Sequence, residues 1–135
     1  MKNLSLYVLV ALFSFSFWSC KSSSDNISSE ITTTQLVETD FKYDTACVVG
    51  DTLFARVSYS GGCGTHEFSL ESNGVLLKSL PPKQPLSIVH RSDDDPCRAL
   101  IIENLKFSIS SYRGTQSGTT VILLENWNQH LSYSY

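Results

Sequence analysis

The sequence has little positive charge and no place where that charge gathers. Its 135 residues hold 10 Lys and Arg against 13 Asp and Glu, which gives a formal net charge of −3. No cluster or stripe of basic residues interrupts this balance. Binding to nucleic acids and polybasic attachment to membranes both depend on such clusters, so the composition argues against both.

Helical periodicity and internal repeats are also lacking. Instead, short runs of alternating polarity recur between turn residues, for example residues 53–59 (LFARVSY), 86–91 and 105–110. After the turn at residues 72–74, we expect the strand pattern to resume at residues 75–77. Alternation of period two is typical of strands with one buried face. We predict about seven to nine such strands in an all-β domain, a single antiparallel β-sandwich of the immunoglobulin type, with a small barrel as the alternative.

Only one long apolar run occurs, at residues 4–18, and it is short for a membrane span. As a helix it would extend about 22 Å at ~1.5 Å per residue, against a hydrocarbon core of ~30 Å. Lys2 precedes this run, and Ser19 and Cys20 follow it. This is the layout of a bacterial lipoprotein signal peptide, with cleavage before the cysteine. We predict that residues 1–19 are removed.

Lipidation of Cys20 would then anchor the protein. We expect diacylglycerol on its sulfur and an acyl chain such as palmitate on its amine, and two chains give durable attachment. Phe17 and Trp18 stand where such signals commonly have Leu and a small residue. Ordinary secretion with cleavage near Ser19, or an uncleaved anchor, therefore stay open as alternatives. The predicted location is the cell envelope, on the outer membrane, facing the periplasm or the surface.

The segment after Cys20 is rich in Ser and Thr as far as residue 34 and has few large apolar groups. Such a composition cannot bury enough surface to offset the entropy lost on ordering. We therefore predict three parts: a signal peptide at 1–19, the lipidated cysteine with a flexible tether at 20–34, and a β-sandwich at 35–135.

Three cysteines are left once Cys20 carries lipid, and an oxidising compartment favours one disulfide and one thiol. Cys63 lies in a glycine-rich loop, and Cys97 follows the acidic turn at residues 93–96. Both lie at the ends of strand patterns, so we predict a disulfide between them. Cys47 lies in an apolar stretch, residues 46–49, and we expect it to be buried.

A metal site is the competing interpretation of the same residues. Cys63 and His66 are separated by two residues, and His90 lies shortly before Cys97. Two thiolates and two imidazoles make a closed tetrahedral zinc site. Oxidation would remove both thiolates together, so we favour the disulfide, flanked by two histidines that hydrogen-bond the loop. The prediction is then no cofactor, with zinc at these four residues as the alternative.

Catalysis has weaker support. A nucleophilic dyad of Cys63 with a histidine would need an activated thiolate and a third group to orient the base, and the sequence indicates neither. No catalytic residue is assigned, and we predict a binding protein and not an enzyme.

An acidic run and a group of aromatic residues are two further candidate ligand sites. The acidic run at residues 93–95 has the carboxylates that calcium prefers but lacks the glycine and distal glutamate of an EF-hand loop, so a solvated turn is favoured. Trp127, Tyr133 and Tyr135 either cover one end of the core or form a surface on which a glycan stacks.

Five segments carry a resemblance to a known family: SGGCGTHEFSL (60–70), SLPP (79–82), LSIVH (86–90), DDPCRALI (94–101) and LKFSIS (105–110). Over residues 43–135 the chain resembles a family of small Bacteroidota lipoproteins in which a GGCxxHxF element precedes a His…Asp-x-Cys element and a strand that begins Leu-x-Phe-Asp. Ser108 stands in place of that aspartate. The resemblance implies a shared fold and no particular activity.

We therefore expect a membrane-anchored lipoprotein whose sandwich binds an envelope or extracellular protein or a glycan. The loops that carry Cys63 and Cys97 are the expected contact.

Overall fold

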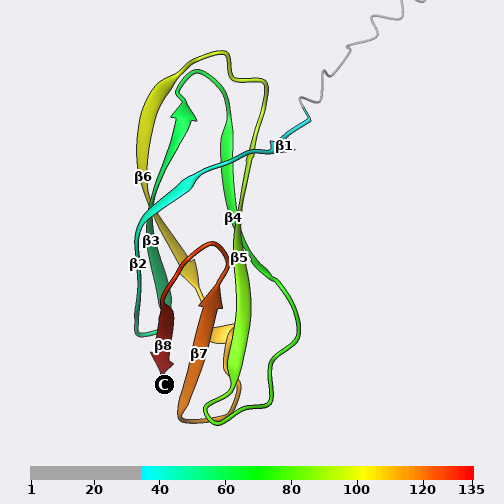
Figure 1. Cartoon of the computed structure of the whole chain (residues 1–135), viewed down its shortest axis with the longest axis vertical. Helices are drawn as coiled ribbons and strands as arrows, with labels where there is room; N and C mark the ends of the chain where they lie inside the picture. The colour runs from blue at the N-terminus through cyan, green and yellow to red at the C-terminus, as the bar shows by residue number, and fades with distance from the viewer. Residues whose placement is uncertain (1–34) are drawn as a thin grey trace, which may run out of the picture. The chain divides into compact units, whose positions relative to one another are not determined.

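The structure is a computed structural model that describes residues 35–135. The predicted signal peptide, Cys20 and the tether lie outside the described residues. Within the described residues, eight strands and one short 3₁₀ helix follow one another (Figure 1): β1 Val37–Glu38, β2 Lys42–Val49, β3 Thr52–Gly61, β4 His66–Ser72, β5 Lys83–Ser92, β6 Ala99–Ser108, η1 Ser110–Tyr112, β7 Thr119–Leu124 and β8 His130–Ser134. Within residues 35–135, no helix is long and apolar enough to cross a membrane.

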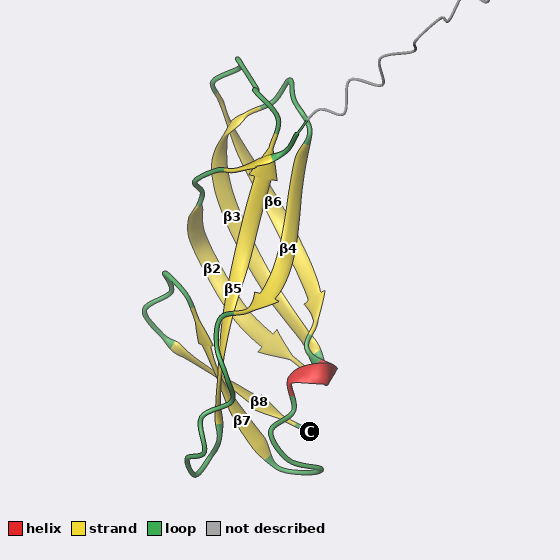
Figure 2. Ribbon diagram, turned by 90° about the vertical axis from the view of Figure 1, so that its right-hand side faces the viewer, coloured by secondary structure: helices red, strands yellow, loops and turns green. Residues whose placement is uncertain are grey.

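The strands form two sheets packed face to face, so the predicted all-β sandwich is confirmed (Figure 2). One sheet has the order β1-β5-β7-β8, with β4 paired to β5, and the other has the order β2-β3-β6. All pairs are antiparallel except β5 and β7, which run parallel. A parallel pair needs a crossover, and here β6 provides it by lying in the other sheet. The immunoglobulin-type arrangement stays a prediction.

The core lies between the two sheets and is built from the alternating rows that the sequence predicted. Leu53, Ala55, Val57 and Tyr59 of β3 are all buried, as are Leu86, Ile88 and His90 of β5. Rows of this kind interdigitate across a sandwich and exclude water from its middle. The other buried hydrophobic residues are Leu105, Ile109, Ile122, Leu124, Leu131 and Tyr133.

Two local predictions are wrong. Cys47 is exposed and not buried. It lies on β2, at the edge of its sheet, where Ala46 and Val48 face the core and Cys47 between them faces solvent. The stretch at residues 75–77 does not resume a strand, and only an isolated bridge joins Leu77 to Lys83. The chain there is an exposed loop between β4 and β5.

The chain enters the sandwich at the same end as the two cysteines. Strand β1 pairs with the last residues of β5, where Val37 lies opposite Ser92, and this is also the end at which β4 and β6 begin (Figure 1). The C-terminal residue Tyr135 lies at the opposite end, beside Gly118.

Candidate functional site

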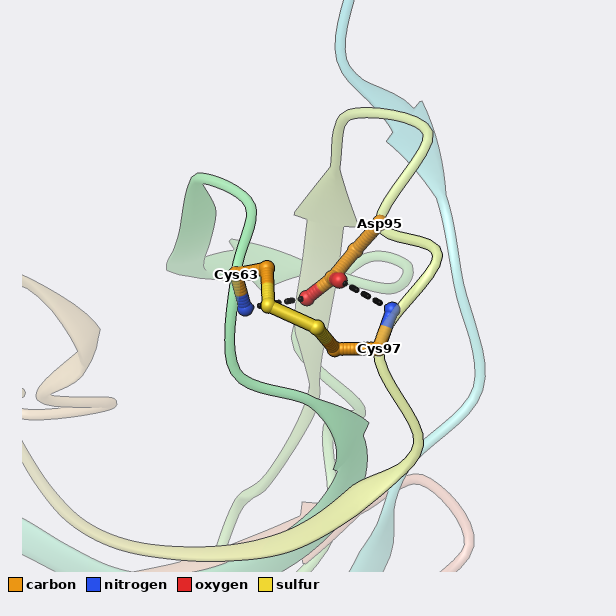
Figure 3. Close-up of side chains that lie close together, drawn as sticks. All are labelled: Cys63, Asp95 and Cys97. Carbon is orange, nitrogen blue, oxygen red and sulfur yellow. Dashed lines mark hydrogen bonds between the residues drawn. A yellow bond between two sulfur atoms is a disulfide. The ribbon is translucent and has the colours of Figure 1, made fainter.

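The densest group of polar side chains lies where the β3–β4 loop meets the segment between β5 and β6. Cys63 of the first and Cys97 of the second form a disulfide, with their Cα atoms 5.7 Å apart (Figure 3). The predicted pairing is therefore confirmed. Asp95 lies directly beside the bridge. We call Cys63, Cys97, Asp95, His66 and His90 the disulfide cluster.

Asp95 holds the two loops together through its carboxylate. Its Oδ2 accepts hydrogen bonds from the backbone N–H of Gly62 at 2.7 Å and of Cys63 at 3.1 Å. Its Oδ1 accepts one from the N–H of Cys97 at 2.8 Å (Figure 3). The hydrogen bond from His66, helped by these N–H donors, holds the pKa of Asp95 well below its usual range. Its side chain, 5% exposed, is therefore an anion at neutral pH.

Two histidines extend this contact into the core. Nε2 of His66 lies 2.9 Å from Oδ2 of Asp95, and its Nδ1 lies 2.9 Å from Nε2 of His90. Nδ1 of His90 lies 3.1 Å from the hydroxyl of Thr39. A carboxylate can only accept, so His66 donates from Nε2. Nδ1 of His66 and Nε2 of His90 then share one hydrogen bond, and Nδ1 of His90 pairs with the hydroxyl of Thr39, which can donate or accept.

Aromatic packing keeps the histidine rings in place. His90 is stacked on Phe68 with 4.2 Å between ring centroids and 3° between planes. Tyr59 lies 4.7 Å from the centroids of both imidazoles. Burial in this apolar setting lowers the pKa of His90 and keeps its ring neutral.

Glycine is required where the β3–β4 loop begins. A Cβ on Gly61 would lie 2.6 Å from Nε2 of His66 and 2.8 Å from Oδ2 of Asp95, which is closer than such atoms can approach. The backbone therefore comes close enough to enclose the hydrogen bond between these two side chains, which shields it from water.

The acidic turn is more than the solvated turn that we predicted. Asp93 accepts a hydrogen bond from the N–H of Thr65 at 3.0 Å, and Asp95 binds the loop as described above, while Asp94 is exposed. Two of the three carboxylates therefore cap backbone N–H groups of the β3–β4 loop. The sequence signal that was missed is the placement of Asp95 two residues before a bridged cysteine.

The four candidate zinc ligands are brought to one end of the sandwich, but they contact one another instead of a common centre. The ligand atoms of Cys63, Asp95 and Cys97 lie within 4.8 Å of one another, whereas His90 binds His66. The two sulfurs are bonded together, and Nε2 of His66 is used by Asp95. Zinc would therefore need a reduced disulfide and a broken His66–Asp95 contact, so the oxidised arrangement does not fit the metal.

The three candidate glycan-stacking residues lie in two places. Tyr133 is buried, and its hydroxyl donates to Asp51 and accepts from Nε of Arg113 at 2.9 Å. Tyr135 packs on Tyr133, with 4.7 Å between ring centroids. Trp127 lies elsewhere, against Tyr43 of β2.

Comparison with known proteins adds no relative. No family model matches the chain, and no match was found among curated proteins or among solved structures. The resemblance to small Bacteroidota lipoproteins therefore stays a prediction that rests on the segments quoted above.

Proposed function

We propose that the chain is a lipid-anchored protein of the cell envelope, on the outer membrane, whose β-sandwich binds a partner protein. The anchor is supported by the sequence around Cys20, with its positive start, apolar run and small residue before the cysteine. Binding is supported by the loop between β4 and β5. We call residues 73–82 the apolar loop.

The apolar loop exposes large aliphatic side chains, and this observation carries the proposal. Leu80 is 99% exposed, Val75 81% and Leu77 44%. Single exposed aliphatic residues are common on protein surfaces, but three within six positions of one loop form a patch, and such patches are typical of protein contacts.

Internal hydrogen bonds fix the shape of this loop. The backbones of Leu77 and Lys83 exchange hydrogen bonds of 2.8 and 3.2 Å, and the hydroxyl of Ser79 donates to the carbonyl of Pro81 at 2.7 Å. Gln84, which is buried, donates to the carbonyl of Gly74. A loop that is already ordered loses little entropy when it binds, so its apolar contacts contribute more to affinity.

The apolar loop also lies far from the point at which the chain enters the sandwich. It leads into the first residue of β5, Lys83, whereas β1 pairs with the last, Ser92 (Figure 1). Ten residues of strand separate these ends by about 33 Å. In the disulfide cluster, by contrast, the side chains of Asp95, His66 and His90 already make hydrogen bonds within the protein. We therefore assign the partner contact to the apolar loop in place of the cysteine loops.

Replacement of Cys20 tests the anchor. In cells grown with labelled palmitate, we expect label on the wild-type chain and on Cys47→Ser, and none on Cys20→Ser. Mass spectrometry of the labelled chain should place its new N-terminus at Cys20. Label that persists in Cys20→Ser would overturn the lipoprotein assignment.

Site-specific photocrosslinking tests the contact. A photoreactive amino acid at Leu77 or Leu80 should give one discrete crosslinked species in intact cells. The same amino acid at the exposed positions Thr45 and Lys106, on strands β2 and β6 of the three-stranded sheet, should not give this crosslinked species. Identical crosslinking from all four positions, or none from the loop, would contradict the proposal.

A further inference from the structure

We propose a second binding site, for a short oligosaccharide of pyranose sugars, in the hollow between the start of β2 and the turn that joins β7 to β8. The hollow has a volume of about 420 Å³. Ligand sites in proteins commonly measure ~300–1,000 Å³, so one or two sugar rings fit. We call it the aromatic hollow, and its lining residues are Phe41, Lys42, Tyr43, Asn126, Trp127 and Asn128.

Three aromatic rings form one wall of the aromatic hollow. Phe41 and Tyr43 pack edge to face with their centroids 4.9 Å apart, and Tyr43 and Trp127 do so at 5.9 Å. All three are only partly buried and rest on the core. The C–H face of a pyranose is apolar while its hydroxyls point outward, so it suits a wall of rings with polar groups at the rim.

Trp127 carries a buried hydrogen-bond donor that is not satisfied. Within residues 35–135, its indole Nε1 is buried and has no hydrogen-bond partner. Buried donors are nearly always paired, and an orphan of this kind calls for a bound water or ligand group. Indole N–H can only donate, and a sugar hydroxyl can accept. Because Trp127 lines the hollow, we assign this missing partner to a sugar hydroxyl bound there.

The rim of the hollow carries amides and a single charge. Asn126 and Asn128 are exposed, and each amide offers both donors and an acceptor, as hydroxyl groups require. Lys42 is the only charged lining residue. Burial raises the pKa of Tyr43 to about 12, so its hydroxyl stays neutral. The amides and the tyrosine hydroxyl suit the hydroxyls of a neutral sugar, whereas Lys42 would also attract an anion, and the charged probe below separates the two.

The turn that carries these residues is held in a fixed shape. The N–H of Glu125 donates to the carbonyl of Leu86 at 2.9 Å, and the N–H of Trp127 closes the turn onto Leu124 at 3.2 Å. Asn126 adopts a left-handed backbone with φ of 59°, which asparagine tolerates better than most residues. The rim amides are thus presented by an ordered turn.

The test uses the indole signal of Trp127 in nuclear magnetic resonance. The chain has two tryptophans, and Trp18 lies in the predicted signal peptide. The indole signal that disappears in Trp127→Ala is therefore the signal of Trp127. Probes are the trisaccharides of N-acetylglucosamine and of glucose, and a charged one of galacturonic acid, each at up to about 10 mM, the range of weak single-site binding. We expect a neutral trisaccharide to shift the indole signal saturably.

Variants separate this site from unspecific contact. Binding to Trp127→Ala, which lacks the indole, is followed through the backbone amide signal of Asn128. Its dissociation constant should be about tenfold or more above that of the wild type, as for an aromatic anchor, and Asn128→Ala should weaken binding without risk to the core. Phe54→Ala is the matched control, since this half-buried ring on β3 does not line the hollow and has Lys106 above it at 5.8 Å. That variant should bind the sugar as the wild type does.

Two results would overturn the inference. One is no saturable shift with either neutral trisaccharide. The other is binding of the galacturonic acid probe alone, lost in Lys42→Ala and kept in Trp127→Ala, which would indicate simple charge attraction. Because the aromatic hollow shares no residue with the apolar loop, crosslinking from Leu80 and sugar binding can fail independently.

Discussion

Oδ2 of Asp95 accepts a hydrogen bond from Nε2 of His66 at 2.9 Å, and this contact joins two loops that are far apart in the sequence. The same oxygen binds backbone N–H groups next to Cys63, and the other carboxylate oxygen binds the N–H of Cys97. The disulfide therefore lies beside a carboxylate that fixes both of its loops. The cluster acts as a structural clamp at the end where the chain enters the sandwich.

Asp95→Asn should destabilise the protein far more than Asp94→Asn. The amide keeps the size of the side chain but loses its charge, and its NH₂ group faces backbone donors that need an acceptor. We expect the melting temperature to fall by several degrees in Asp95→Asn and to stay unchanged in Asp94→Asn, whose side chain is exposed. Thermal melts followed by circular dichroism measure both. Equal melting temperatures for the two variants would contradict the role of Asp95.

Stability should fall in two steps as the pH is lowered. The pKa of His90 is lowered in the folded state, so the unfolded chain takes up that proton first, from pH ~6.5 downward, and the free energy of unfolding decreases. The pKa of Asp95 is also lowered, so its contribution is present above pH ~3.9 and is lost as the pH falls below that value.

Urea unfolding at pH values between about 8 and 3, spaced about one unit apart, covers both reference pKa values and measures both losses of stability. Asp95→Asn should flatten the acid step, and His90→Gln should flatten the step that starts near pH ~6.5. A free energy of unfolding that increases as the pH is lowered from neutral to mildly acid would show that His90 is not held neutral in the folded state.

The strands of the core were predictable because each has one face in the sandwich. Residues 53–59 and 86–91 alternate in polarity except at Phe54 and Val89, and the structure buries the row that the pattern indicated. The same rule failed at Cys47, since a single small apolar residue of an edge strand can face solvent at little cost in stability. The parallel pairing of β5 with β7 was not predictable, because it depends on β6 joining the other sheet.

The site was predictable in its covalent part and not in its polar part. Spacing and compartment indicated the bridge between Cys63 and Cys97. The role of Asp95 depends on a fold that brings residues 62–66 against residues 93–97, and a carboxylate in an acidic turn looks solvated until that packing is known. The apolar loop was missed because its apolar residues 75–77 follow a strand and a turn and were expected to form the next strand, while their exposure follows from tertiary packing.

Gly61→Ala should disturb the cluster more than Gly50→Ala. A Cβ at position 61 would collide with His66 and Asp95, which we expect to cost about 1–3 kcal/mol of the free energy of unfolding. At position 50 nothing lies within 4 Å, and only the left-handed φ of 55° opposes the change, at a cost of about 1–2 kcal/mol. Nuclear magnetic resonance of the imidazole protons separates the two, since only Gly61→Ala should shift the signals of His66 and His90. Unshifted histidine signals in Gly61→Ala would contradict the close approach.

Removal of the disulfide should lower stability substantially. Cys63 and Cys97 are 34 residues apart, and a loop of that length restricts the unfolded chain by about 3.8 kcal/mol on the chain-entropy model. We expect the double variant Cys63→Ser/Cys97→Ser to lose a large part of this amount in urea unfolding. Cys47→Ser, an exposed change, should alter the free energy of unfolding by about 0.5 kcal/mol or less.

The reduced wild-type protein also tests the zinc alternative. After reduction with a phosphine and exposure to zinc, elemental analysis should find no zinc retained after gel filtration, because His66 and Asp95 satisfy each other. Zinc retained at one ion per chain, and lost in His66→Gln, would instead establish the metal site.

Cys47 should react with a thiol reagent in the folded, unreduced protein. Its side chain is exposed on β2 opposite Phe54, whereas the sulfurs of Cys63 and Cys97 are bonded to each other. Among the three cysteines of residues 35–135, peptide mapping after alkylation should find label at Cys47 alone, and at all three only after reduction. A shift of β2 by one residue would turn Cys47 into the core and expose Ala46 and Val48. Protection of Cys47 in the native protein, with labelling only in urea, would therefore show that the register of β2 differs from the one described here.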